Sequence, residues 1–140
     1  MPDHRHDRGI VDTSVVIDLQ RIDPDDLPGE LAISAVTLAE LAAGPHSTND
    51  PIERAHRQDR LQRVEATLDP IPVDGGVARA YGRIYAAVAS SGRKARGRRA
   101  LDLLIAATAL AAGLPLYTRN RDDFGELDGL LEIVAVELSR

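Results

Sequence analysis

Three acidic residues stand apart from the other charged residues because each lies among apolar neighbours. Asp12 directly follows an apolar run that reads as a strand. Glu40 is the only charged residue in the segment 31–44, and Asp102 is the only one in the segment 100–118. An ionised carboxylate in apolar surroundings is unstable unless it is protonated, paired with a cation or bound to a metal ion. These three acids are therefore the first candidates for chemistry.

The elements around the acids alternate between short β-like runs and longer helical ones, which is typical of an α/β domain with a parallel sheet. The expected strands are 9–12, 31–34, 71–73, 116–118 and 133–136. The expected helices are 13–20, 36–43, 49–68, 75–90 and 100–112, with a basic loop at 91–99. No repeat, linker or domain boundary interrupts this pattern, so we expect one domain over residues 1–140.

Strand ends bring the acids together in this scheme, because the crevice of an open α/β sheet lies beyond the carboxyl ends of its strands. Asp12 lies at the end of the first strand, and Glu40 lies about one turn into the helix that follows the second. Asp102 is expected in the first turn of its helix, near the same edge. The run 119–123 (RNRDD) follows another strand. A cluster of carboxylates without thiolates or grouped histidines favours a hard cation such as Mg²⁺ or Mn²⁺.

Each acid also has an ordinary structural interpretation. Asp12 could serve as the N-cap of the next helix, and Asp102 could complement the dipole of its own helix. Glu40 could belong to a buried ion pair. The joint occurrence of all three acids, in this order, is what favours a shared site.

Composition excludes several classes of protein. The chain has 140 residues, of which 44% are hydrophobic and 28% charged, as in soluble globular domains. The absence of cysteine excludes disulfides, thiolate zinc sites and a cysteine nucleophile, and it fits a cytoplasmic protein. The first ten residues lack the apolar core of a secretion signal. The apolar stretch 103–116 is shorter than the roughly 18–20 residues that cross a bilayer.

The formal net charge of −5 argues against binding nucleic acid by overall charge, but positive charge is concentrated locally. The run 93–99 carries five basic residues just before the helix that contains Asp102: Arg93, Lys94, Arg96, Arg98 and Arg99. Arg119 and Arg121 flank the predicted site on its other side. We expect these seven side chains to contact phosphates, with a solvated loop as the alternative for the basic run. Arginines 54, 57, 60 and 63 share a helical face and are interpreted as surface residues.

Three segments resemble one known family. The runs 10–19 (IVDTSVVIDL), 36–44 (VTLAELAAG) and 101–124 (LDLLIAATALAAGLPLYTRNRDDF) resemble the PIN domain, and more narrowly the VapC toxin ribonucleases of bacterial toxin–antitoxin pairs. The resemblance covers essentially the whole chain in the right order. It implies a three-layer α/β fold, with a parallel sheet of about five strands flanked by helices. It also implies Mg²⁺- or Mn²⁺-dependent endonuclease activity on RNA, a small antitoxin partner, and a homodimer within a toxin–antitoxin complex.

Carried over by position, the resemblance assigns the first three acids of the family's site to Asp12, Glu40 and Asp102. Many PIN domains have a further aspartate two residues after the strand-end threonine, where this chain has Asn120. Asp123 matches a second acidic position, and Asp122 lies beside it. We take Asp123 as the fourth acid and expect Asn120 to stay near the site.

The resulting hypothesis is hydrolysis of an RNA phosphodiester by water, which leaves a 5′-phosphate and a 3′-hydroxyl. Asp12 and Asp102 would hold the principal metal ion, and Glu40 would bind it directly or through water. Asp123 would hold a second ion or orient the water. Three hydroxyls are candidates for positioning carboxylates or phosphate: those of Thr13, Ser14 and Thr118. Local capping is the alternative for all three and the preferred one for Ser14.

Two other functions remain open at this point. A phosphatase of the haloacid-dehalogenase type also begins with an aspartate at a strand end, but it needs a second aspartate where this chain has Ser14. It also needs a buried lysine, whereas the only lysine here is Lys94 in the basic loop. A PIN-like module that binds RNA or a partner without cleaving is favoured only by Asn120.

Overall fold

The computed structural model describes residues 4–92 and 97–139, apart from the side chain of Arg98. Its centre is a sheet of five strands: β1 (Arg8–Val11), β2 (Glu30–Ser34), β3 (Pro70–Ile71), β4 (Leu116–Thr118) and β5 (Ile133–Ala135). The strand order is β3-β2-β1-β4-β5, and every neighbouring pair is parallel. The α/β fold with a five-stranded parallel sheet is thereby confirmed.

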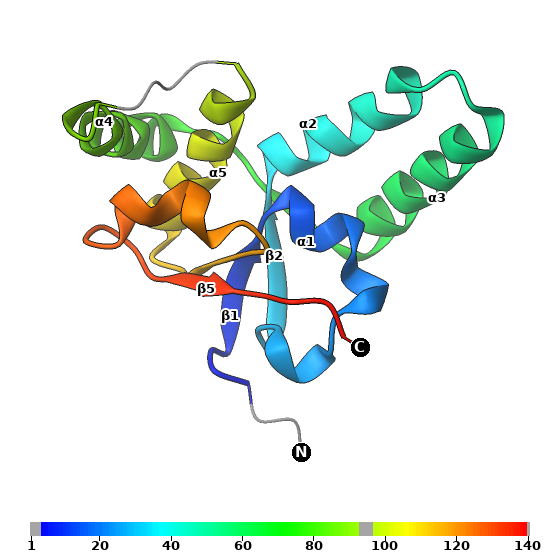
Figure 1. The fold of residues 1–140 in the computed structure, drawn as a ribbon, viewed down its shortest axis with the longest axis horizontal. Coiled ribbons are helices and arrows are strands. Elements are labelled where there is room, and N and C mark those ends of the chain that lie inside the picture. Colours follow the sequence, from blue (N-terminus) through cyan, green and yellow to red (C-terminus); the bar gives the residue numbers. More distant parts are fainter. Residues whose placement is uncertain (1–3, 93–96, 140) are drawn as a thin grey trace.

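The main helices are α1 (Thr13–Ile17), α2 (Ala35–Ala43), α3 (Pro51–Thr67), α4 (Gly75–Ser90) and α5 (Arg98–Ala112). The described residues also form four short 3₁₀ helices in the connections between these elements and the strands: η1 (Leu19–Arg21), η2 (Pro24–Asp26), η3 (Gly44–Ser47) and η4 (Arg121–Leu127). Figure 1 shows α4, α5 and η4 on one side of the sheet and α1, α2 and α3 on the other. The sheet between these two groups of helices gives the expected three layers.

Alternating side chains on the strands supply two separate cores, because successive residues of a strand point to opposite faces. On β1, Ile10 packs into the cluster formed with α4 and α5, whereas Val11 packs into the cluster formed with α1 and α3. On β4, Leu116 and Tyr117 divide in the same way. Both faces of the sheet are therefore covered, as parallel sheets require.

Helix boundaries follow local signals. Asp50 caps α3 by accepting a hydrogen bond from the backbone of Ile52 at 3.0 Å, and Pro51 occupies the first turn, so α3 begins later than the expected residue 49. The expected helix 13–20 ends at Ile17 and is followed by η1. None of the described helices is both long and apolar enough to cross a membrane.

Two features near the site were not anticipated. Helix α5 begins at Arg98 rather than at residue 100, after Gly97 with its positive φ of 59°, so Asp102 lies in the second turn. The segment after β4 forms η4, whose Phe124 and Leu127 are buried in the core. Their spacing of three residues places both side chains on one side of a 3₁₀ helix.

The space around Gly9 of β1 and around Gly82 of α4 predicts opposite effects on stability when each is replaced by alanine. An added Cβ at Gly9 of β1 would lie 2.7 Å from Cε1 of the fully buried Tyr117 ring. We expect Gly9→Ala to lower the free energy of unfolding by about 1–3 kcal/mol, as overpacking does. A Cβ at Gly82 of α4 meets nothing within 4 Å, so Gly82→Ala should raise it by about 0.5–1 kcal/mol.

Urea denaturation of the two variants and the unsubstituted protein at one pH measures both effects. A Gly9→Ala protein as stable as the unsubstituted one would contradict the described packing of Tyr117 against β1.

Candidate functional site

Asp12 lies at the carboxyl end of the central strand β1, and both of its carboxylate oxygens are held. The Thr118 hydroxyl donates to Oδ2 at 2.5 Å, and the backbone N–H of Val15 donates to Oδ1 at 3.3 Å. The Ser14 hydroxyl also donates to Oδ1. The N-cap interpretation of Asp12 is therefore confirmed for α1: the capping oxygen Oδ1 also accepts from Ser14, and the Thr118 hydroxyl holds the other oxygen, Oδ2.

Burial sets the ionisation of this acid. Asp12 is 5% exposed, and burial raises its pKa above the ordinary value, with hydrogen bonds from Ser14, Thr118 and Val15 acting in the opposite direction. Among the side chains that the structure describes, no arginine or histidine forms an ion pair with it. A cation bound at this carboxylate would therefore compensate a charge that the described protein leaves unpaired.

The backbone just after β4 is linked to Asp12 through the two hydroxyls that donate to its carboxylate. The backbone N–H of Asn120 donates to the Thr118 hydroxyl at 3.0 Å, and that of Arg119 donates to the Ser14 hydroxyl at 3.2 Å. The backbone N–H of Asn120 is thus one hydroxyl away from the Asp12 carboxylate. Ser14 is a correction, because its hydroxyl holds Asp12 rather than capping a helix. The sequence signal for this contact is a hydroxyl residue two positions after an acid at a strand end, because that spacing lets the hydroxyl reach the carboxylate.

Glu40 reaches the site through the residue that follows Asp12. The Thr13 hydroxyl donates to Oε1 of Glu40 at 2.8 Å and lies 3.2 Å from the Thr37 hydroxyl. Thr13 and Glu40 line a cleft of about 560 Å³ together with Leu101 from the start of α5. The alternative of a buried ion pair is not observed for Glu40 in the described part of the chain.

Asp102 is half-buried on α5, directly after Leu101. The first turn of α5 contains no acidic residue, so the helix-dipole interpretation of Asp102 loses its basis. Among the residues that the structure describes, no three acidic or histidine side chains converge closely enough to hold a metal ion. The pair of Asp12 and Glu40 is connected through Thr13, whereas the grouping of all four acids stays a prediction.

The available donors suit a hard cation. They are carboxylate and hydroxyl oxygens, the ligands that Mg²⁺ and Mn²⁺ prefer, and no thiol exists in the chain. Asp12 contributes a buried carboxylate whose two oxygens already have fixed directions. The chemistry of the residues present therefore fits the ion that the family resemblance implies.

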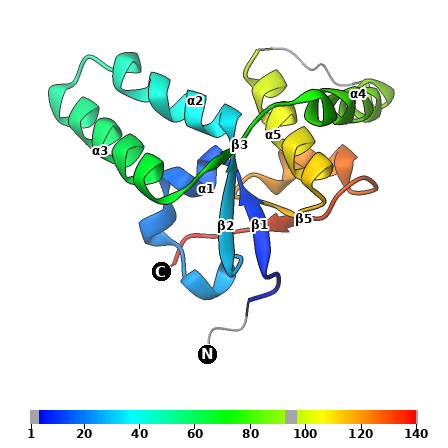
Figure 2. The ribbon, with the colours of Figure 1, turned by 180° about the vertical axis from the view of Figure 1, so that it is seen from behind.

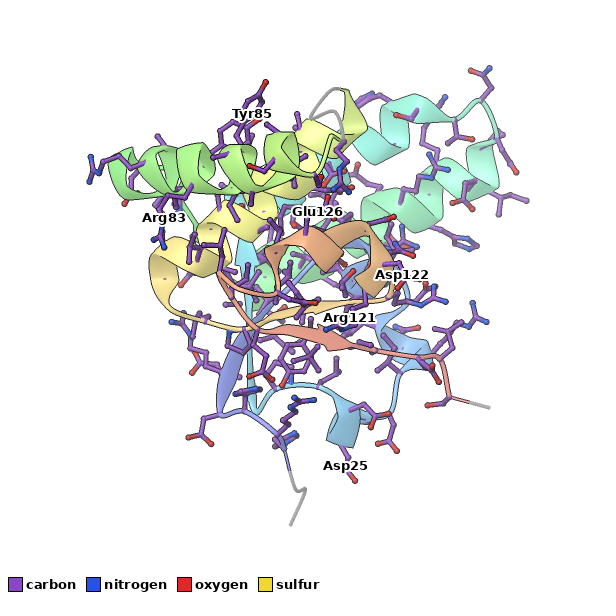
Figure 3. The ribbon with its side chains drawn as sticks, turned by 60° about the vertical axis from the view of Figure 1, so that its left-hand side comes forward. Asp25, Arg83, Tyr85, Arg121, Asp122 and Glu126 are labelled. Atoms are coloured by element: carbon purple, nitrogen blue, oxygen red, sulfur yellow. The ribbon has the colours of Figure 1, made fainter. Side chains whose placement is uncertain are left out.

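Arg99 connects α5 to η4. Its guanidinium donates to the backbone carbonyl of Asp123 and to the carboxylate of Glu126, and the two side chains are only 15% and 11% exposed. Figure 3 shows Glu126, Asp122 and Arg121 on this segment. Arg99 was expected to contact RNA, whereas in the structure it holds the segment of Asp123 against the helix of Asp102. Sequence reasoning missed Glu126, because its partner lies 27 residues away.

The remaining predicted basic contacts are paired or lie outside the described residues. Arg119 forms an ion pair with Asp18, and Arg121 pairs with Asp128 at 3.1 Å. One shallow pocket of about 380 Å³ is lined by Arg119, Asn120, Arg121, Asp122 and Asp123. Arg93, Lys94 and Arg96 lie outside the described residues, as does the side chain of Arg98. Contact of these side chains with RNA stays a prediction.

Comparisons with a family model and with known proteins give matches over most of the chain. The family model described as "PIN domain" matches residues 9–130. The chain is 36% identical over 133 residues to the ribonuclease VapC5 of Mycobacterium tuberculosis, covering 93% of this chain and 95% of that protein. It is 31% identical over 134 residues to the ribonuclease VapC1 of Rickettsia felis, covering 91% and 95%.

A solved structure is similar as well. The crystal structure of VapBC-5 from Mycobacterium tuberculosis, a member of the VapBC family of toxin–antitoxin systems, matches with a TM-score of 0.81 and 38% identity. The match covers 93% of this chain and 99% of the other.

The raised pKa of Asp12 predicts a pH-dependent gain on substitution. Protonation of Asp12 stabilises the folded state, so its contribution is complete below the ordinary pKa of 3.8 and is lost as pH rises through the raised folded-state pKa. In metal-free buffer at about pH 7, Asp12→Asn should therefore be more stable than the unsubstituted protein, and this advantage should vanish near about pH 4.

Urea midpoints in EDTA across this range measure the effect. Asp69→Asn is the matched control, because Asp69 is exposed and precedes the edge strand β3, which the strand β2 separates from β1. Equal midpoints for Asp12→Asn and the unsubstituted protein at every pH would contradict the effect of burial.

Proposed function

The chain belongs to the PIN-domain family, among the VapC ribonuclease toxins of toxin–antitoxin systems, and from this premise we propose that it hydrolyses RNA phosphodiesters with Mg²⁺ or Mn²⁺ as cofactor. The observation that carries the proposal is the Asp12 carboxylate, buried at the end of the central strand and held by two hydroxyls. Residues 1–140 act as one domain in this proposal.

Each of the four acids has its own role in binding the ion. Asp12 and Asp102 are its principal ligands, Glu40 binds it directly or through water, and Asp123 is the fourth acid. When bound, the ion neutralises charge on the phosphate and favours ionisation of water near neutral pH. Asn120 and Asp122 border Asp123 in the same pocket and are the alternatives for the fourth position.

The protein's other groups keep these ligands in place. The hydroxyls of Ser14 and Thr118 fix the direction of both Asp12 oxygens, and the Thr13 hydroxyl orients Glu40. Such supporting hydrogen bonds orient the ligands and tune their basicity. Arg99 and Glu126 hold η4, and with it Asp123, against α5.

The reaction is attack of water on phosphorus, with departure of the ribose 3′-oxygen. The phosphorus–3′-oxygen bond breaks, so the products carry a 5′-phosphate and a 3′-hydroxyl. The water oxygen ends on the phosphate, and its protons pass to solvent and to the leaving 3′-oxygen. The ribose 2′-hydroxyl takes no part.

The partners follow from the same premise. A relative described as a member of the VapBC family of toxin–antitoxin systems supports an antitoxin that binds this chain. That the antitoxin is small and that this chain forms a homodimer within the complex rest on the family resemblance. A toxin that cleaves RNA of its own cell acts in the cytoplasm. The match to PIN-domain ribonucleases removes the support for a haloacid-dehalogenase phosphatase.

One alternative retains an observation in its favour. Asn120 stands where many family members have an aspartate, and a module that binds RNA without cleaving it would not need that acid. Incubation with RNA separates this alternative from the nuclease, because only the nuclease cleaves the RNA.

Cleavage of end-labelled single-stranded RNA tests the proposal. We expect cleavage with Mg²⁺ or Mn²⁺, none with EDTA, and none by Asp12→Asn or Asp102→Asn, because each removes a ligand of the ion. Thr118→Val removes no ligand of the ion but loses two supporting hydrogen bonds, the one to Asp12 and the one from the Asn120 backbone, and should lower the cleavage rate about 10–100-fold. Asp69→Asn is the control and should cleave normally.

Equal cleavage by the unsubstituted protein and Asp12→Asn would overturn the nuclease proposal. RNA binding by the unsubstituted protein without cleavage, with either ion present, would favour the non-cleaving module instead.

A further inference from the structure

Four arginines of the described chain line clefts beside the predicted acids: Arg57, Arg60, Arg119 and Arg121. Three of them are engaged within the protein. Arg119 and Arg121 pair with aspartates, and Arg57 donates to Oε1 of Glu53 at 3.0 Å and to the carbonyl of Gly44 at 2.9 Å. Arg60 is the exception, since no described residue forms a hydrogen bond or an ion pair with its guanidinium.

The sequence interpretation of this helical face as surface needs revision. Arg54 donates to the carbonyls of Pro45 and Thr48, at 3.0 and 2.7 Å, and so ties α3 to the connection from α2. Arg57 makes the same kind of tie at Gly44. Arg60, one turn further along α3, lies beyond the reach of that connection and faces the cleft instead.

The place of Arg60 in the fold is distinctive. It lines the cleft of about 560 Å³ that also contains Glu40 and Thr13. It also lines a neighbouring cleft of about 600 Å³ between α1 and α3, and Ile17 of α1 borders both. Figure 2 shows α2 and α3 as two arms on one side of the sheet, with α1 beside them. Arg60 is half-buried at this junction.

A half-buried guanidinium without a partner offers five N–H donors to whatever occupies the cleft. Oxygen acceptors with negative charge satisfy these donors best. The same cleft contains Glu40, a predicted ligand of the ion at which the scissile phosphate must lie. An RNA chain carries a phosphate on every nucleotide, so a strand that crosses the acids presents further phosphates on both sides.

We propose that the RNA strand leaves the acids through the cleft between α1, α2 and α3, and that Arg60 binds a phosphate next to the scissile one. This inference rests on the proposed function and extends it, because it assigns the direction of the strand and a substrate-binding residue. Arg57, fixed by Glu53 and Gly44, forms the wall of the cleft rather than a mobile phosphate contact.

Salt-dependent RNA binding tests the role of Arg60. The measurement uses fluorescence anisotropy of a labelled single-stranded RNA of about twelve nucleotides, with all proteins carrying Asp12→Asn to prevent cleavage. Arg60→Gln should weaken binding about three- to tenfold and reduce the slope of log K against log salt by about 0.7, the share of one phosphate contact. Arg60→Lys keeps the charge and should keep the slope.

Arg83→Gln is the matched control, because Arg83 is an exposed arginine of α4 on the other side of the sheet (Figure 3). It should bind RNA as the parent protein does. Thermal unfolding should be unchanged for Arg60→Gln, since no described hydrogen bond is lost. With Asp12 intact, Arg60→Gln should raise KM for RNA by a similar factor while kcat stays within about twofold.

An unchanged salt slope and KM for Arg60→Gln, in a protein that binds and cleaves RNA, would overturn this inference and leave the proposed function standing. Absence of RNA binding and cleavage by the unsubstituted protein would instead remove the proposed function itself. A glutamate-rich peptide serves as a further probe. If Arg60→Gln weakens its binding but not that of RNA, the cleft takes an acidic protein segment, and the inference fails.

Discussion

A carboxylate buried at the end of the central strand is the constraint on which the rest of the site depends. Asp12 can ionise only if its neighbours stabilise it, and the strand order places those neighbours on both sides. Thr118 at the end of β4 donates to it from one side, and Thr13 leads to Glu40 of α2 on the other. The parallel arrangement with β1 in the middle thereby brings segments far apart in sequence to one acid.

The charged residues near the site differ in whether they are paired within the protein. Most described arginines near the site bind acidic residues or backbone carbonyls, and they fix the position of α3, η4 and the end of β4. Asp12 and Glu40 form no ion pair with a described side chain, and neither does Arg60. Overall acidity therefore says little about binding RNA, because the distribution of the charges decides which groups are available.

The sequence predicted the larger features correctly because they follow from local patterns. The bounds of β4 and α4 agree with expectation, and the alternation of short strand-like runs with longer helical ones predicted an α/β domain with a parallel sheet. The ends of β1 and β4 meet at one edge of the sheet, where the Thr118 hydroxyl donates to Asp12. The contact between Arg99 and Glu126, the engagement of Ser14 and the isolation of Arg60 depend on tertiary packing. No local pattern encodes which distant side chain meets which.

Anomalous diffraction from crystals grown with Mn²⁺ tests the central claim most directly, because it locates the ion independently of activity. The account predicts an anomalous peak within ligand distance of an Asp12 carboxylate oxygen, in the unsubstituted protein, and no peak there in crystals of Asp12→Asn. An ion bound only at a place without contact to Asp12, or the same peak in both proteins, would contradict the claim that this buried carboxylate holds the cofactor.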